Sequence, residues 1–164
     1  MNKISERIKR VEDNIGSACA RCGRSREDVK LIVVTKSASF EAVQEVINLG
    51  ITNLGENRVQ QLKKVSSQLA DIYKDKDSAI FRKINWHMIG HLQRNKVRQV
   101  LPIASLIHSV DTLRLAEEIN IGAKKLNMNA KVLLQVNTSN EPQKYGVPIG
   151  AAIHLAEQLE TLYN

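Results

Sequence analysis

The feature that most constrains the fold is an alternation of short apolar runs with helical patterns along the chain. The runs are rich in branched aliphatic residues, which is typical of strands, and apolar residues at spacings of three and four follow them, which is typical of helices. The predicted strands are Leu31 to Thr35, Ile51 to Leu54, Ile84 to Ile89, Ile103 to His108 and Lys131 to Asn137. No hairpin signal separates these runs, so the pattern predicts parallel strands joined by helical crossovers, which is an α/β fold.

The helical patterns fill the segments between the strands. The predicted helices run from Ile4 to Cys22, from Phe40 to Leu49, from about Glu56 through Leu69, from about Leu92 to Leu101, from an N-cap at Asp111 through Leu126, and through Ile153 to Leu159. Asp71 to Lys83 is polar and is either a long connector or a helix extension. Pro142, Gly146 and Pro148 predict a loop after the fifth strand.

The length of the chain limits the architecture. With 164 residues and 43% hydrophobic content, we expect a single domain covering residues 1–164. A closed (β/α)8 barrel needs eight units and about 250 residues, whereas five units are visible here. The N-terminus lacks the apolar stretch of a signal peptide, and no run of about eighteen apolar residues occurs, so we expect a cytoplasmic protein without membrane association.

Two features of the sequence suggest functions other than ligand binding at the sheet: a pair of cysteines and a basic net charge. Cys19 and Cys22 have the C-x-x-C spacing, but both fall on the apolar stripe of the first helix, which Gly23 would cap, so we expect neither a metal site nor a redox pair. The net charge of +7 and pI of about 9.5 invite a nucleic-acid hypothesis. Because the basic residues are spread out and aromatic residues make up 4% of the chain, nucleic acid is a minor hypothesis.

Polar residues collect just past the predicted strands. Lys36 follows the first strand, and a lysine withdrawn from water favours its neutral amine, which attacks carbonyl compounds to form a Schiff base. In α/β folds the residues at the carboxyl ends of the strands, here called the rim, line the ligand site. The other rim residues are Gly55, Glu56, Asn57, Gly90, His91, His108, Ser109, Asn137, Thr138 and Ser139. His87 and His91 are four apart, but Gly90 interrupts the spacing, so we expect structural roles rather than metal binding.

An ordered set of motifs covers nearly the whole chain. They are Val33–Lys36 (VVTK), Leu54–Gln60 (LGENRVQ), Trp86–Lys96 (WHMIGHLQRNK), His108–Asp111 (HSVD), Leu134–Asn137 (LQVN), Lys144 and Gly146. Together they resemble the pyridoxal phosphate homeostasis protein family, of the YggS type. The resemblance implies a parallel (β/α) barrel of the alanine-racemase N-terminal type, here incomplete with about five of eight units.

The same resemblance implies a cofactor and residues that hold it. Lys36 would carry pyridoxal 5′-phosphate (PLP) as an aldimine, and Asn57 would hydrogen-bond the cofactor. Met88 and Ile89 are candidates to pack on its ring, although core packing suits them equally. His91 and Asn137 are further candidate neighbours of the cofactor. No catalytic residue is assigned, because the family binds PLP without established turnover and serves intracellular PLP homeostasis.

The sequence departs from the family at its C-terminal end. Family members continue with a serine and glycine segment and an arginine and glycine segment that hold the phosphate, and neither occurs before Asn164. An open edge at the fifth strand predicts self-association unless it is covered. The alternatives are a PLP-dependent racemase or decarboxylase remnant, a basic nucleic-acid-binding domain, and an inactive fragment.

Overall fold

A parallel five-stranded sheet forms the centre of the molecule. The computed structural model describes residues 3–73 and 83–163. The strands stand in the order β1-β2-β3-β4-β5. Their bounds are Val33–Val34 (β1), Asn53–Glu56 (β2), Asn85–Met88 (β3), Ala104–Val110 (β4) and Val132–Leu134 (β5). Each strand therefore pairs with the next one in the chain, and all pairs are parallel, which confirms the predicted α/β class.

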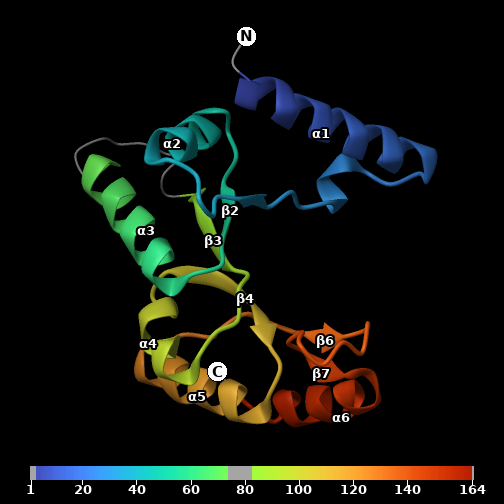
Figure 1. Cartoon of the computed structure of the whole chain (residues 1–164), viewed down its shortest axis with the longest axis vertical. Helices are drawn as coiled ribbons and strands as arrows, with labels where there is room; N and C mark the ends of the chain where they lie inside the picture. Colours follow the sequence, from blue (N-terminus) through green and yellow to red (C-terminus); the bar gives the residue numbers. More distant parts are fainter. Residues whose placement is uncertain (1–2, 74–82, 164) are drawn as a thin grey trace.

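In the described part of the chain, four helices connect the five strands and lie along one side of the sheet, whereas the first helix precedes β1 and the last lies beyond the sheet (Figure 1). The helix bounds are Lys3–Arg21 (α1), Phe40–Asn48 (α2), Val59–Tyr73 (α3), Val97–Val100 (α4), Leu113–Lys125 (α5) and Ile149–Glu160 (α6). The described residues also include the 3-10 turns Arg26–Asp28 (η1) and Arg94–Lys96 (η3). The polar stretch predicted from Asp71 to Lys83 continues α3 as far as Tyr73, and its residues 74–82 lie outside the described residues.

The hydrophobic core lies between the sheet and this helical layer. Leu54 of β2, Trp86 of β3 and Ile107 of β4 are buried there together with the apolar sides of α2, α3, α4 and α5. Val33 and Leu54 are opposite each other, as are Leu54 and Trp86. Because side chains alternate along a strand, the residues between these positions point to the other face of the sheet.

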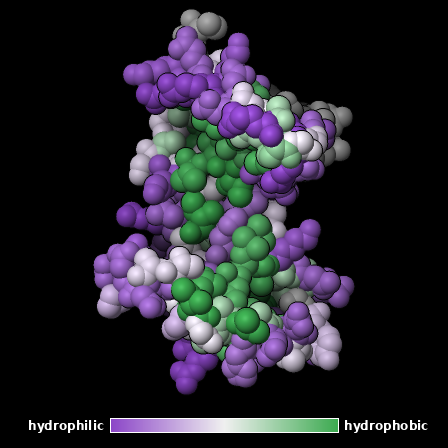
Figure 2. Space-filling view, turned by 90° about the vertical axis from the view of Figure 1, so that its right-hand side faces the viewer, coloured by the Kyte–Doolittle hydropathy of each residue, from purple (hydrophilic) through white to green (hydrophobic). Residues whose placement is uncertain are grey.

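That other face is partly open to solvent. Val34 of β1 is 46% exposed and Leu133 of β5 is 47% exposed. Figure 2 shows hydrophobic surface gathered along the middle of one side of the molecule. An apolar run such as Leu31 to Thr35 is typical of a strand that is buried on both faces. In the structure the strand proper is shorter, Val33–Val34, and Val34 lies on the face that the helices leave open.

The predicted fifth strand, Lys131 to Asn137, divides at Gln135. The N–H of Gln135 donates to the carbonyl of Val110 in β4 at 2.7 Å, whereas its carbonyl accepts from the N–H of Val147 at 2.8 Å. The residues after it form β6 (Val136–Asn137), which pairs in parallel with β7 (Val147–Pro148). The predicted loop around Pro142 and Pro148 thus contains a short strand that the proline and glycine signals concealed.

Three predicted helix starts need correction. α3 begins at Val59 rather than near Glu56, because Glu56 still pairs with Met88 at the end of β2. The helix predicted from Leu92 to Leu101 is a 3-10 turn followed by the short α4. The N-cap of α5 is Thr112 rather than Asp111, because the Thr112 hydroxyl accepts from the N–H of Leu115 at 3.3 Å.

The two cysteines lie at the end of α1 with different exposure. Cys19 is buried and Cys22 is exposed, and both are free thiols. The expectation that both lie on the apolar stripe is therefore wrong for Cys22, whose thiol instead donates to the carbonyl of Ala18 at 3.1 Å. None of the helices described is long and apolar enough to cross a membrane.

Candidate functional site

Lys36 stands in a tight turn between β1 and α2. The N–H of Thr35 donates to the carbonyl of Gly55 at 3.0 Å and extends the pairing of the two strands by one residue. The chain then turns, with the N–H of Ala38 donating to the carbonyl of Thr35 at 3.0 Å and Ser37 in the left-handed region at φ 63°. Ser39 caps α2 by accepting from the N–H of Ala42. The turn therefore presents Lys36 at the carboxyl end of the sheet. The lysine is exposed, so the expectation that it is withdrawn from water is wrong for this structure.

A pocket of about 320 Å³ opens beside this lysine. Its lining residues come from the turn after β1 and from the turn that joins β2 to α3: Lys36, Ser37, Ala38, Glu56, Asn57, Arg58 and Gln61. Ligand sites of small molecules occupy roughly 300–1,000 Å³, so the pocket is at the small end of that range. The structure thus brings two of the predicted site residues, Lys36 and Asn57, into the wall of one pocket.

Gly90 determines the position of Asn57. The N–H of Ile89 donates to the carbonyl of Glu56 at 2.9 Å, which keeps β2 and β3 together beyond their last paired residues. A Cβ atom at Gly90 would stand 2.1 Å from the carbonyl oxygen of Asn57, and real Cβ contacts are never this close. The backbone of Asn57 therefore occupies the space that a side chain at position 90 would need.

Glu56 is buried in the wall of the same pocket and is 0% exposed. Its Oε1 lies 2.5 Å from the hydroxyl of Thr35, and its Oε2 has no hydrogen-bond partner among residues 3–73 and 83–163. Removal from water raises the pKa of the Glu56 carboxyl, against the lowering effect of the Thr35 hydrogen bond. Burial therefore favours a neutral acid at this position.

Met88 and Ile89 point to opposite faces of the sheet. Met88 is 0% exposed and belongs to the core beneath the helices. Ile89 is half-buried, and its Cδ1 and Cγ2 atoms lie beside Gly55, 3.4 and 3.5 Å from the position that a Cβ atom there would take. Ile89 thus lies on the less covered face, next to the strand that leads to Asn57.

A hydrogen-bonded group of polar side chains lies on that face of the sheet. The Nδ1 of His87 is 2.9 Å from Nε2 of His108, and the Nε2 of His87 is 3.2 Å from Oδ1 of Asn53. His87 is 2% exposed, and burial lowers its pKa to about 4, assisted by repulsion from His108 when that ring is protonated and from the charge of Lys30. Burial also lowers the pKa of His108. Both imidazoles are therefore neutral near pH 7.

His91 lies in a different pocket, of about 420 Å³, which Asp111, Arg114 and Tyr145 also line. Its ring stacks on that of Tyr145, with centroids 3.8 Å apart and planes 13° apart. Its Nδ1 is 4.0 Å from Oδ2 of Asp111. The structure does not bring His91 into the pocket that Lys36 lines.

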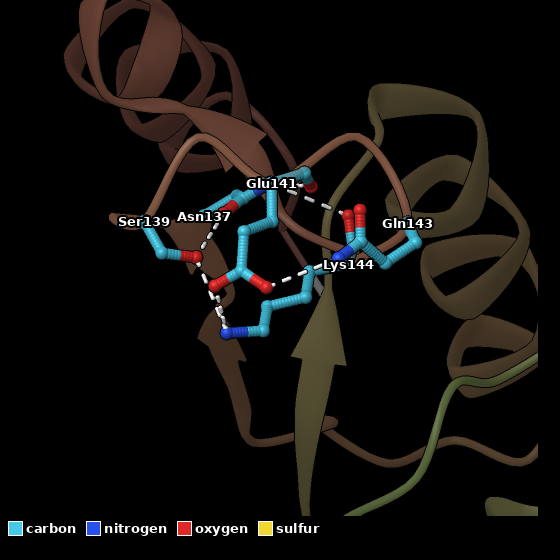
Figure 3. A network of polar contacts seen from close by, with 5 residues as sticks. All are labelled: Asn137, Ser139, Glu141, Gln143 and Lys144. Atoms are coloured by element: carbon cyan, nitrogen blue, oxygen red, sulfur yellow. Dashed lines mark hydrogen bonds and ion pairs between the residues drawn. The ribbon is translucent and has the colours of Figure 1, made fainter.

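Asn137 holds together the loop between β6 and β7, as Figure 3 shows. Its Nδ2 donates to the carbonyls of Glu141 at 3.0 Å and Lys144 at 3.4 Å, and its Oδ1 accepts from the hydroxyl of Ser139 at 3.2 Å. Lys144 forms an ion pair with Glu141 in the same loop. Asn137 lines a third pocket, of about 450 Å³, so its amide is engaged in the loop rather than in the Lys36 pocket.

The Lys36 pocket includes Arg58 and Gln61, which were not singled out from the sequence. Arg58 and Gln61 follow Asn57, and their position in the turn and the first part of α3 is the signal that points to them. Glu56 is recognisable only as a rim residue, because its burial depends on the packing around it. Among the described residues, no three His, Cys, Asp or Glu side chains are grouped so that they could hold a metal ion.

Known proteins resemble the chain along most of its length. It matches no protein-family model. A pyridoxal phosphate homeostasis protein from Vibrio alginolyticus is 34% identical over 164 residues, which is 100% of this chain and 68% of that protein. One from Aquifex aeolicus is 39% identical over 142 residues, or 87% of this chain and 58% of that protein. The chain thus spans about three fifths to two thirds of the length of these relatives.

Solved structures agree with this relationship. A crystal structure of an unknown protein from Bifidobacterium adolescentis has a TM-score of 0.86 and 34% identity, covering 97% of this chain and 64% of that one. The structure of PipY from Synechococcus elongatus with PLP bound has a TM-score of 0.76 and 30% identity, covering 98% and 66%. A mutant of CdALR, at a TM-score of 0.60 and 15% identity, supports the alanine-racemase-like fold alone. The motifs, the parallel sheet and these similarities agree, and the chain belongs to the pyridoxal phosphate homeostasis protein family.

Proposed function

We propose that this chain binds PLP without turnover and serves intracellular PLP homeostasis by buffering or delivering the cofactor. The observation that carries the proposal is that Lys36 and Asn57 line one pocket at the carboxyl ends of β1 and β2. The PLP-bound PipY structure and the names of the curated relatives support it. When bound, PLP supplies an aldehyde that condenses with a primary amine.

The residues of the pocket suit such a ligand in different ways. Lys36 offers an exposed amine, and Asn57 offers both a donor and an acceptor for polar groups of the ring. Arg58 is a second cation in the lining and would attract the phosphate. Ile89 offers an apolar contact on the less covered face of the sheet.

The other predicted neighbours of the cofactor have more indirect roles in this proposal. Met88 supports the end of β3 from the core, where it is fully buried. His91 supports the loop after β3 through the stacking of its ring on Tyr145. Asn137 supports the loop between β6 and β7 through the hydrogen bonds of its amide. A direct contact of these three residues with PLP remains a prediction of the family resemblance.

We expect the function to be binding rather than catalysis. Racemisation needs an acid and a base on opposite faces of the reacting carbon, and a buried carboxyl that is favoured in its neutral form would not serve as the base. The relatives are named homeostasis proteins rather than enzymes. Any turnover of amino acids by the chain above that of a Lys36→Ala variant would favour the racemase or decarboxylase alternative.

The experiment that tests this function is retention of PLP. The purified chain, Lys36→Ala and the control Lys64→Ala are each incubated with PLP, passed through a desalting column and examined by absorbance. We expect the chain and Lys64→Ala to retain the cofactor and Lys36→Ala to lose it. Equal retention by all three proteins would contradict the role of Lys36, and retention by none would contradict the function.

Two further proposals concern the surroundings of the protein. We expect it to act in the cytoplasm. We also expect copies of the chain to associate through the outer edge of β5, because β5 stands at one end of the five-stranded sheet and carries the exposed side chain of Leu133.

A further inference from the structure

Glu56 is a buried titratable group for which PLP binding alone gives no reason. Its side chain is 0% exposed at the end of β2, and it makes no ion pair within 4.0 Å with any Lys, Arg or His side chain described. Two cations, Lys36 and Arg58, line the pocket in whose wall it lies, from the turns after β1 and β2. A glutamate among the core residues of a strand is uncommon unless it is paired, so its arrangement calls for an explanation.

The surroundings of Glu56 suit a carboxyl that carries a proton better than they suit a carboxylate. As a carboxylate, Glu56 would accept from Thr35, and its charged Oε2 would remain buried without a donor. As a neutral acid, it donates from Oε1 to the hydroxyl of Thr35, and Oε2 is then a carbonyl oxygen, which costs far less to bury unpaired. The hydroxyl of Thr35 in turn donates to the carbonyl of Gly55, 3.4 Å away.

The hydrogen bonds that link Glu56, Thr35 and Gly55 reach the residue just before Lys36, which is Thr35. Thr35 is 2% exposed, and its N–H and its hydroxyl both point to the carbonyl of Gly55. Its own carbonyl accepts from the N–H of Ala38 and closes the turn that contains Lys36 and Ser37. The position of Thr35 therefore sets the position of the turn.

We propose that Glu56 is a positioning residue that acts as a neutral hydrogen-bond donor and, through Thr35, fixes the turn that presents Lys36 to the pocket. The neutral form also keeps a negative charge away from the lysine. A carboxylate close to Lys36 would stabilise the ammonium form and slow the attack of the amine on an aldehyde. The raised pKa that burial gives to Glu56 agrees with this state.

The proposal rests on the proposed function for its first readout, the rate at which PLP and borohydride label Lys36. Glu56→Gln replaces the acid by an amide that donates to Thr35 in the same way, and Thr35→Ser keeps the hydroxyl. Glu56→Ala and Thr35→Val each remove one partner. We expect the two conservative variants to keep the labelling rate within about twofold and the other two to slow it roughly tenfold, as the loss of one strong hydrogen bond would.

A second readout does not depend on PLP. Amide hydrogen exchange reports the bonds from the N–H of Thr35 to Gly55 and from the N–H of Ala38 to Thr35. We expect Glu56→Ala and Thr35→Val to increase exchange at both amides, and Glu56→Gln to preserve their protection. Because Glu56 and Thr35 act through the same hydrogen bond, the double variant Glu56→Ala/Thr35→Val should exchange little faster than either single variant. Circular dichroism confirms that each variant is folded, and a variant that does not fold is replaced by Glu56→Leu, which fills the space without a donor.

The two readouts separate the two proposals. If Lys36 is not labelled in the unchanged chain but exchange follows the expected order, the PLP function is wrong and the positioning role stands. If Glu56→Gln behaves like Glu56→Ala in both readouts, or if Glu56→Ala changes neither, the positioning role is wrong. A labelling rate in Glu56→Gln that falls with the exchange protection intact would also overturn it, because the carboxyl would then act on Lys36 directly.

Discussion

At the scale of single residues, Gly90 shows how a missing side chain positions a candidate site residue, Asn57. The backbone of Asn57 passes so close to Gly90 that a Cβ atom would stand 2.1 Å from its carbonyl oxygen. The atoms that this Cβ would meet belong to the backbone of Asn57. Backbone atoms cannot rotate away as the end of a flexible side chain can. The pocket therefore depends on glycine at this position for a steric reason that does not involve its φ angle.

We predict that Gly90→Ala displaces Asn57 and weakens PLP retention at least tenfold, with a loss of roughly 1–3 kcal/mol in the free energy of unfolding, as overpacking does. The matched control is Gly150→Ala in α6, where a Cβ atom meets nothing within 4 Å. Urea unfolding and PLP titration measure the two effects. A Gly90→Ala protein that is as stable and binds as tightly as Gly150→Ala would contradict this role.

His87 gives the protein a second testable property, which is a dependence of stability on pH. Its pKa is lowered from 6.5 to about 4 in the folded protein, so between these values the unfolded chain binds more protons. The free energy of unfolding should therefore rise as pH increases from about 4 to 6.5, by roughly 3 kcal/mol from this group. Acidification through the same range removes that stability.

Urea unfolding at several pH values tests this prediction. We expect His87→Asn to be less stable at pH 7, because it breaks the bonds to His108 and Asn53, and to show a clearly smaller gain between pH 4 and 6.5. His154→Asn, on an exposed position of α6, is the control and should keep the full gain. If the pH dependence of His87→Asn equals that of the control, the assignment to His87 is wrong.

At the scale of elements, the sequence predicts the strands better than their limits. Alternating apolar runs located all five strands of the main sheet, because buried parallel strands need continuous apolar residues. β7 was missed because Val147–Pro148 is two residues long and lies between a glycine and a helix. The predicted start of α4 was wrong because residues 94–96 form a 3-10 turn, and the spacing of apolar residues does not distinguish such a turn from an α-helix.

The sequence also predicts some residues of the candidate site better than others. The rim position of Lys36 and Asn57 follows from the order of strands and helices alone, and the structure brings both into one pocket. The sequence could not separate His91 and Asn137 from that pocket, because their placement depends on a ring stack with Tyr145 and on a folded loop. Nor could it show that Glu56 is buried, since burial depends on packing between elements.

The loop between β6 and β7 yields a prediction at this scale. Asn137→Ala removes the donor to the carbonyls of Glu141 and Lys144 and the acceptor for Ser139. We expect a loss of roughly 1–2 kcal/mol in the free energy of unfolding and faster amide exchange in residues 138–146. Gln143→Ala, which removes one exposed bond to Glu141, is the control and should change little. Unchanged exchange in the Asn137 variant would show that the network does not hold the loop.

At the scale of the whole molecule, the open face of the sheet is the main feature to be explained. Helices cover one face, whereas Val34 and Leu133 remain nearly half exposed on the other. The curated relatives extend beyond the matched region, since the chain covers 58% and 68% of two of them. Apolar surface of this kind commonly marks an interaction site.

We therefore predict that the chain self-associates with increasing concentration, and that Leu133→Lys reduces this association. The control is Leu126→Lys, at the C-cap of α5 in the helical layer, because both leucines are 47% exposed. Sedimentation velocity over a range of concentrations measures the effect. A chain that remains monomeric at every concentration, or an equal effect of the two substitutions, would contradict association through this edge and face.

The central claim is that Lys36 is the residue that holds PLP. The most direct measurement is to reduce the mixture of chain and PLP with borohydride, digest it, and locate the added mass by mass spectrometry. The account predicts that the label concentrates on the peptide with Lys36 at low PLP concentration, and that Lys36→Ala loses it. A label distributed over exposed lysines in both proteins, with no preference for Lys36, would contradict the account.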